Sequence, residues 1–179
     1  MSKIWHPPLP LSFIATDNAE SFRHFAIAQT GIPFPPHPGA FGVKRKNHIH
    51  EGVDLYCPEG TPVSAVEDGV VVALLPFTGE HAGLPWWENT FALLVEGASG
   101  VVVYGEILPD KTLLTGDAVL AGENLGQVAR VLKKDKGRPM AMLHMELHTL
   151  GTRFTPPWYE EKPPTLLDPT PLLLPLASL

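Results

Sequence analysis

The chain of 179 residues has one cysteine, Cys57, and no long apolar run. A single cysteine excludes a disulfide within the chain, so we expect no covalent cross-link to hold the fold. No segment approaches the roughly 20 apolar residues that a membrane-spanning helix needs. The first residues also lack the apolar core of a secretory signal peptide, so the sequence by itself points to the cytoplasm.

Positive charge is also scarce in this chain. Its 13 lysine and arginine residues stand against 19 aspartate and glutamate residues, which gives a net charge of -6. Two basic clusters stand out, at residues 44–46 and 133–136, and neither makes the broad basic face that is typical of nucleic-acid-binding proteins. We therefore expect no nucleic-acid partner. The two clusters are either solvated turns or the rim of a site for an anion.

Proline and glycine, in contrast, are abundant, with 20 and 16 residues respectively. They separate short valine-rich runs of the kind that forms strands. The strand candidates are residues 61–66, 69–75, 90–95, 100–107 and 140–149. Short strands between frequent turns predict a mainly β protein, either a sandwich or a half-open barrel. One short helix is expected near Asp17–Gln29, with a polar cap at its start and Gly31 past its end.

The length of the chain suits one domain, which buries about 70% of the surface that its unfolded form exposes. We divide the chain into an amino-terminal helix with a proline-rich connector (1–38), a β domain (39–174) and a short tail (175–179). The prolines between residues 33 and 38 define the connector, because proline favours an extended chain.

Three residues of kinds that bind zinc lie in two distant segments. His50 and Asp54 flank Gly52, and His144 follows much later in the chain. A catalytic zinc site uses three such ligands and leaves a fourth position open for water. Residues four apart on a straight strand lie about 13 Å apart, so the chain must bend between His50 and Asp54, and Gly52 is best able to permit that bend. The alternative is an exposed loop histidine beside a turn-forming aspartate.

A series of short motifs runs in order through most of the chain, roughly from residue 39 to residue 174. They are Phe41-Gly42-Val43-Lys44-Arg45, His50-x-Gly52-x-Asp54-Leu55, Gly60-Thr61-Pro62-Val63, Asn89-Thr90-Phe91, Gly116-Asp117-x-Val119-x-Ala121-Gly122 and Leu167-Asp168-Pro169. Together they resemble the lysostaphin-type, LytM-like family of zinc metallopeptidases, most of which cut peptide cross-bridges in bacterial cell walls. The resemblance implies a β-rich half-open barrel, built on a duplicated hybrid motif, that holds Zn²⁺ in a groove through His50, Asp54 and His144.

Two positions depart from the pattern of that family. The family carries two further catalytic histidines, one in a Tyr-x-His-Leu motif and one at the start of His-x-His. In this chain Glu106 stands at the first position and Met142 at the second. Methionine cannot act as a base, whereas glutamate does so in other zinc peptidases. We therefore take Glu106 as the candidate base, with a solvated carboxylate as the alternative, and Met142 as a degenerate position.

Polar residues near the ligands could support them. Glu146 and His148 share a strand face with His144 by period-two alternation. Glu146 is similar to a glutamate of the family and is expected to orient a ligand. His148 is expected to be an exposed histidine beyond the site. His48, two residues before His50, either approaches the metal or stays exposed.

Aromatic residues and one more histidine are candidates for the groove. Tyr104 is either a groove residue or a packed strand aromatic, and packing is the better interpretation. His81, in the loop of residues 76–88, could fold over the groove and supply a base. Trp86 and Trp87 of the same loop could wall a substrate groove, although packing of the loop is the simpler explanation.

Three functions stay open on the sequence alone. The first is a zinc-dependent hydrolase of peptide bonds with an altered acid/base set, which by family analogy acts on peptide or peptidoglycan-like substrates in the cell envelope. The second is a catalytically silent protein that keeps zinc and serves as a binding or regulatory module. The third is a lipoyl- or biotinyl-carrier-like domain, which needs a lysine at a hairpin tip and leaves His50 and Asp54 without a role. Whether the chain is an enzyme is thus undecided at this point.

Overall fold

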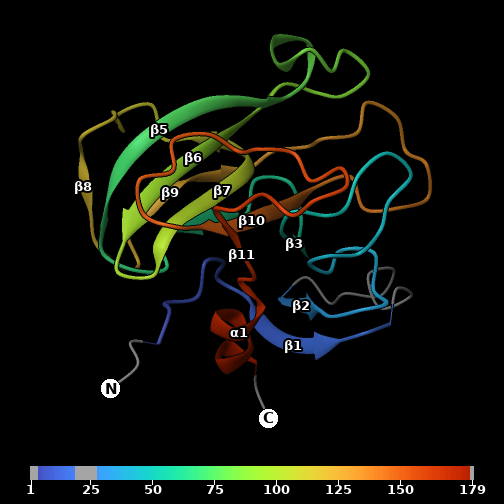
Figure 1. Cartoon of the computed structure of the whole chain (residues 1–179), viewed down its shortest axis with the longest axis horizontal. Helices are drawn as coiled ribbons and strands as arrows, with labels where there is room; N and C mark the ends of the chain where they lie inside the picture. Colours follow the sequence, from blue (N-terminus) through green and yellow to red (C-terminus); the bar gives the residue numbers. More distant parts are fainter. Residues whose placement is uncertain (1–3, 19–27, 178–179) are drawn as a thin grey trace.

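The computed structural model describes residues 4–18 and 28–177, and strands dominate its regular structure (Figure 1). One sheet contains nine strands. They are β3 (Val53–Tyr56), β4 (Pro62–Ser64), β5 (Gly69–Thr78), β6 (Thr90–Gly97), β7 (Gly100–Pro109), β8 (Ala118–Val119), β9 (Asn124–Val128), β10 (Met142–His148) and β11 (Leu166–Leu167). Each of the five strand candidates overlaps one of these strands. The prediction of a mainly β protein is therefore confirmed.

The nine-stranded sheet is open and antiparallel. Its hydrogen-bonded order is β11-β10-β7-β6-β5-β8, while β3 pairs with β10, and β9 pairs with both β4 and β7. Within the described residues no pairing joins β11 to β8, so the strands wrap into a half-open barrel rather than a closed one. β10 has β3 on one side and β7 on the other along part of its length, which brings three segments of the chain to its middle.

The central strands β6 and β7 are buried on both faces. Alternate residues face a large core that includes Leu93, Val95 and Val102, and the residues between them face a second, smaller core that includes Leu94 and Val103. This alternation is the period-two pattern of a strand, applied to a sheet with no exposed face at its centre.

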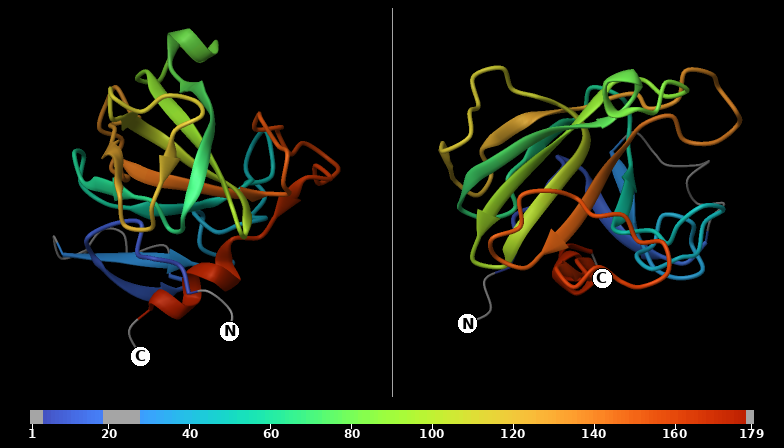
Figure 2. Two further views of the ribbon diagram at one scale, coloured as in Figure 1. Left: turned by 90° about the vertical axis from the view of Figure 1, so that its left-hand side faces the viewer. Right: turned by 45° about the horizontal axis from the view of Figure 1, so that its top comes forward.

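The amino-terminal residues add a second, two-stranded sheet that the sequence did not predict. β1 (Ser12–Thr16) and β2 (Gln29–Pro33) pair in parallel and lie below the main sheet, beside the short helix α1 (Thr170–Leu173) (Figure 2). Phe13 and Ile32 are buried in the large core, as is Leu173 of α1. The predicted domain boundaries stay a prediction, but the core contains residues from both sides of residue 39.

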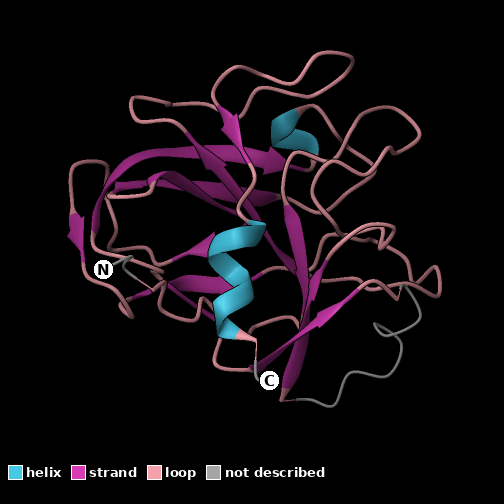
Figure 3. Ribbon diagram, turned by 60° about the horizontal axis from the view of Figure 1, so that its bottom comes forward, coloured by secondary structure: helices cyan, strands magenta, loops and turns pink. Residues whose placement is uncertain are grey.

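The helix expected at Asp17–Gln29 falls mainly on residues 19–27, which lie outside the described residues. Its last residue, Gln29, begins β2. Among the described residues the helical segments are α1 and two 3-10 turns, η2 (Glu80–Ala82) and η3 (Leu174–Leu176) (Figure 3). None of the helices in the described ranges has the length and apolar character to cross a membrane.

Candidate metal centre

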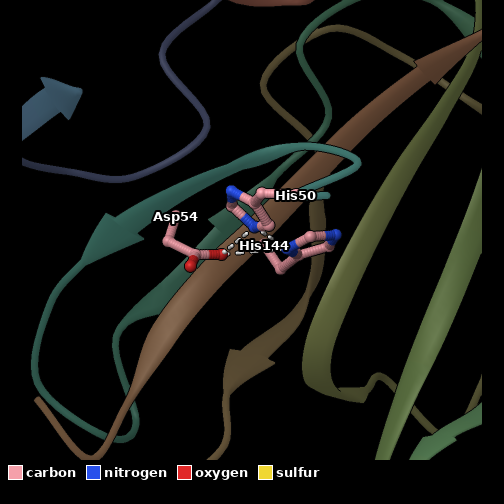
Figure 4. A group of neighbouring side chains, drawn as sticks. All are labelled: His50, Asp54 and His144. Carbon is pink, nitrogen blue, oxygen red and sulfur yellow. Dashed lines mark hydrogen bonds and ion pairs between the residues drawn. The ribbon is translucent and has the colours of Figure 1, made fainter. Parts of the chain in front are cut away.

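Two antiparallel strands bring the three candidate ligands together. Asp54 of β3 pairs in register with His144 of β10, and His50 approaches from the segment just before β3 (Figure 4). The chain bends at Gly52, as predicted. A Cβ atom at that position would lie 2.2 Å from the Met145 carbonyl oxygen, so Gly52 also allows the bend to press against β10.

The three donor atoms are spaced as a small cation requires. His144 Nδ1 lies 2.9 Å from Asp54 Oδ1, which in turn lies 3.2 Å from His50 Nε2. The two histidine nitrogens are 3.3 Å apart. Ligands at zinc-typical distances in a tetrahedral site are separated by about 3.3–3.6 Å. All three residues are buried, and this group could hold a metal ion after a small relaxation.

Hydrogen bonds on the far side of each ligand fix its orientation. His50 Nδ1 lies 2.9 Å from the Ala40 carbonyl oxygen. A carbonyl can only accept, so Nδ1 carries a proton and Nε2 is left for the metal. Arg45 donates to Asp54 Oδ2 at 2.7 Å and leaves Oδ1 directed at the histidines. Such outer partners orient metal ligands and raise affinity for the metal.

A longer hydrogen-bonded chain supports His144. Its Nε2 lies 2.9 Å from Glu146 Oε1, and Glu146 Oε2 lies 2.7 Å from His148 Nε2. His148 Nδ1 then lies 3.0 Å from the Thr165 hydroxyl. The expectation that His148 is exposed is therefore wrong, since its exposed fraction is 0%. Residue Thr165, from a distant segment, covers this end of β10 and supplies the partner.

The electrostatics of the cluster follow from this pairing. Burial opposes the charge on His144, but hydrogen bonds to Asp54 and Glu146 raise its pKa well above the usual value for histidine. Burial likewise opposes charge on Asp54, yet the nearby His50 and His144 hold the pKa of this carboxyl well below its usual value. The pKa of Glu146 is lowered to about 2, because hydrogen bonds from His144 and His148 outweigh its burial. A metal ion at this centre would compete with a proton on His144.

Glu106, the candidate base, is half-buried next to this cluster, and its Oε2 atom is shielded from solvent. It follows Gly105 on β7, which pairs with His144. Burial, with the charge of Asp54, raises the pKa of Glu106 to about 8. Its Oε2 atom has no hydrogen-bond partner within the described part of the chain. The backbone φ of Glu106 is 62°, a left-handed conformation that is costly for a residue other than glycine.

The other predicted groove residues are spread more widely. Met142 begins β10 and pairs with Tyr56. Tyr104 lies in the large core, where its hydroxyl accepts the Val66 N–H at 2.9 Å, so the packed interpretation describes it and the groove interpretation does not. His81 does not join the ligands: its Nε2 lies 2.8 Å from the Thr90 carbonyl oxygen and its ring packs edge-on against Phe91.

The structure also shows where His48 and the two tryptophans of the 76–88 loop lie. His48 Nε2 lies 3.6 Å from Glu51 Oε2, and its side chain stays partly exposed. Trp86 and Trp87 make an edge-to-face pair with ring centroids 6.2 Å apart. Trp86 is 60% exposed, so much of its ring stays open to solvent.

Sequence reasoning gave no role to three residues beside the ligands. Arg45 is one of them. Tyr56 is another, since period-two alternation places it on the strand face of Asp54, and burial together with the charge of Asp54 raises its pKa, so that the hydroxyl keeps its proton. The ring of Phe77 lies 5.4 Å from that of His144. Arg45 had a sequence signal in the motif of residues 41–45, and Tyr56 had one in its spacing of two from Asp54.

Comparison with known proteins identifies relatives of this arrangement. The sequence profile of peptidase family M23 matches residues 48–156, more than half of the chain. No curated protein matches the chain in sequence. The crystal structure of cbpa from L. salivarius REN superposes with a TM-score of 0.54 at 20% identity, over 97% of this chain and 96% of that one.

Two further structures are similar. The catalytic domain of the antimicrobial peptidase lysostaphin from Staphylococcus simulans has a TM-score of 0.51 at 19% identity, over 88% of this chain and 98% of that chain. A mutant catalytic domain of the prophage-encoded M23 protein EnpA from Enterococcus faecalis has a TM-score of 0.49 at 20% identity, over 82% and 92%. The chain spans only 35% and 46% of two longer matched structures, from Helicobacter pylori and Ruminococcus gnavus. The two superpositions with TM-scores above 0.5, at 19–20% identity, support a common fold.

Proposed function

The chain belongs to peptidase family M23, and we propose that it is a zinc-dependent hydrolase of peptide bonds in which Glu106 takes the place of one of the family's two further catalytic histidines. The substrate we propose is a peptide of the kind found in bacterial cell-wall cross-bridges, by analogy with the family. This substrate would place the protein at work in the cell envelope.

His50, Asp54 and His144 are the residues that we assign to zinc. Their donor atoms lie within 3.3 Å of one another, and imidazole and carboxylate are ligands that zinc accepts in catalytic sites. Zinc in such a site acts as a Lewis acid on a carbonyl oxygen and activates water at neutral pH.

Glu106 is the residue that we assign to proton transfer. The observation that carries this role is its position: a carboxylate beside Asp54 and His144, with one oxygen that is buried and free of partners among the described residues. Its pKa of about 8 lies near neutral pH, where a group can take a proton from water and return it to a leaving amine. A nearby cation would favour its ionised form.

Tyr56 completes the proposed set as a hydrogen-bond donor. Its hydroxyl stays protonated near neutral pH because burial and Asp54 raise its pKa. It stands beside Met142, at the position where the family carries a histidine that this chain lacks. A donor aimed at developing negative charge contributes about 10²- to 10³-fold to the rate, so Tyr56 could make up part of that loss.

Replacement of Glu106 tests the proposal directly. Glu106→Gln should lower hydrolysis of a glycine-rich peptide by about 10²- to 10⁴-fold, the usual contribution of a general base, while zinc content measured by elemental analysis stays the same. Glu59→Gln, at an exposed turn position, is the matched control and should keep full activity. Equal activity in Glu106→Gln would exclude Glu106 as the base.

The same experiment separates the alternative function. A chain that binds one equivalent of zinc but hydrolyses no peptide, with or without Glu106→Gln, would be a silent member of the family that acts as a binding or regulatory module. The double variant Glu106→His with Met142→His restores the family pattern. Histidine also tolerates the left-handed backbone at position 106 better than most residues. A gain of activity in this variant would show that the residues at these two positions cause the lack of activity.

A further inference from the structure

A pocket lies outside the metal centre, between the loop that follows β5 and the loop that precedes β10. Its volume is about 320 Å³, and its lining combines two indole rings and one leucine with three lysines. The lining residues are Trp86, Trp87, Leu132, Lys133, Lys134 and Lys136. Neither the proposed metal site nor the proposed proton transfer uses any of them.

Hydrogen bonds between the two loops hold this pocket open. The Glu88 N–H donates to the Val131 carbonyl at 2.9 Å, and Trp87 forms a β-bridge with Leu132. Lys133 Nζ crosses the gap and donates to the Pro85 carbonyl oxygen at 2.8 Å. The pocket therefore exists before any ligand arrives, which lowers the free-energy cost of binding one.

The charge of the pocket is opposite to that of the protein. The chain carries a net charge of -6, yet the described residues that line the pocket include three lysines and no carboxylate. Asp135, which lies between them in sequence, accepts the Gly137 N–H instead. Trp86, at 60% exposure, presents an apolar ring beside the ammonium groups. The complement is a ligand with an apolar group next to a negative charge.

The backbone connects this pocket to the candidate active site. The Ala129 N–H donates to the Glu106 carbonyl at 3.0 Å. Three residues further along the same segment, Leu132 enters the pocket wall, and three residues of extended chain span about 10 Å. An extended peptide bound at the metal centre would therefore reach the pocket with a residue three or so positions from the scissile bond.

We propose that this pocket binds an acidic segment of the peptide substrate, with an apolar side chain against Trp86 and one or more carboxylates beside Lys134 and Lys136. The inference rests on the proposed function, since it names the kind of peptide that the same site would cut. It makes the pocket a specificity site: peptides with acidic residues on this side of the scissile bond are preferred over neutral ones.

Binding of two matched peptides tests the inference without requiring hydrolysis. The probes are Gly-Gly-Gly-Phe-Glu-Glu and its neutral counterpart Gly-Gly-Gly-Phe-Gln-Gln, titrated by calorimetry into the zinc-loaded protein at low salt. Exposed ion pairs contribute modestly and are screened by salt, so we expect the acidic peptide to bind about fivefold tighter or more. The preference should shrink as salt is raised. It should vanish in the double variant Lys134→Gln with Lys136→Gln.

Control variants isolate the pocket. Lys111→Gln, an exposed lysine between β7 and β8 that does not line the pocket, should keep the preference. Trp86→Ala should weaken the binding of both peptides to the same extent, because it removes the apolar contact. Equal affinity of the two peptides in the wild type, or tighter binding of a thymidine oligonucleotide than of the acidic peptide, would overturn the inference. Acid-selective binding without any hydrolysis would instead uphold the pocket and count against the proposed function.

Discussion

The two sides of the candidate active site differ in how completely their polar groups are paired. On the side of β3 and β10, every ligand has an outer partner, and the chain from His144 through Glu146 ends at the Thr165 hydroxyl. On the side of β7, Glu106 is half-buried on a left-handed backbone, and its shielded Oε2 atom has no hydrogen-bond partner in the described ranges. The ligands on the β3–β10 side thus all have hydrogen-bond partners, whereas the β7 side keeps a carboxylate oxygen without one. We call these the paired side and the unpaired side.

This difference separates two tasks of a metallohydrolase. Holding a metal requires ligands whose orientation is set in advance, and a fully hydrogen-bonded shell does that. Moving a proton requires a group whose two protonation states have similar free energies, and an unpaired buried carboxylate meets that need. Strain and unsatisfied groups persist mainly where function requires them. On the proposed function, the site keeps the metal ligands of its family and alters the groups that handle the proton.

Among changes on the paired side, removal of a metal ligand should lower zinc affinity the most. Asp54→Ala deletes one of three donors and leaves Arg45 without its carboxylate, so we expect zinc affinity to fall by more than about 1,000-fold, beyond the 10- to 100-fold typical of outer partners. Competition with a chromophoric chelator measures the change. Asp135→Ala, in the loop before β10, should bind zinc as the wild type does. Near-normal affinity in Asp54→Ala would place the metal elsewhere.

The unpaired side should respond to pH in the metal-free protein. The pKa of Glu106 is about 8 in the folded chain against 4.5 ordinarily, so the folded state binds this proton more tightly than the unfolded state. The free energy of unfolding should then fall as pH rises from about 4.5 to 8, by about 1.4 kcal/mol for each pH unit of that window at most. Glutamine carries no charge at any pH and should avoid this loss.

Urea denaturation with chelator present checks that expectation. Glu106→Gln should be more stable than the wild type by a few kcal/mol at pH 9, since each pKa unit corresponds to about 1.4 kcal/mol. The difference should close as pH falls towards 4.5. Glu59→Gln serves as the exposed control and should follow the wild type throughout. A stability difference that does not vary with pH would mean that the pKa of Glu106 is not raised in the folded chain.

The sequence was more informative about strands and ligand positions than about which distant segments contact each other. Valine-rich runs between glycines predicted five strands, because period-two burial and turn chemistry are local properties. His50, Asp54 and His144 could be selected because zinc restricts the residue types that bind it. Whether they bind zinc stays a prediction, although the structure brings them together.

What the sequence could not predict depended on contacts between distant segments. His148 was expected to be exposed because its own strand gives no hint that Thr165 covers it. β1 and β2 were missed because parallel pairing joins residues with a long connection between them. Glu106 was left undecided between a groove and a solvated position for the same reason: its burial arises from segments that β7 meets only in the folded chain.

The outer partner of His144 should give the smallest of these effects. Glu146 uses one carboxylate oxygen for each of two histidines, at 2.9 Å and 2.7 Å. Glutamine has one accepting oxygen and an NH₂ group that can only donate, so Glu146→Gln can satisfy one histidine N–H but not both. The loss of negative charge also removes one of the two carboxylates, Asp54 and Glu146, that favour a positively polarised His144. We therefore expect zinc affinity to fall by about 10- to 100-fold, well short of the change in Asp54→Ala.

Measurement of zinc affinity at several pH values tests this last comparison. Hydrogen bonds to Asp54 and Glu146 raise the pKa of His144 in the metal-free protein, so zinc competes with a proton there and binds more weakly as pH falls. Loss of Glu146 lowers that pKa, and the pH dependence of zinc binding should become shallower in Glu146→Gln. Glu96→Gln changes a strand glutamate that bonds to Gly151 and Arg153, and it should change neither affinity nor slope. Wild-type affinity and slope in Glu146→Gln would show that the paired chain on β10 stabilises the fold without supporting the metal.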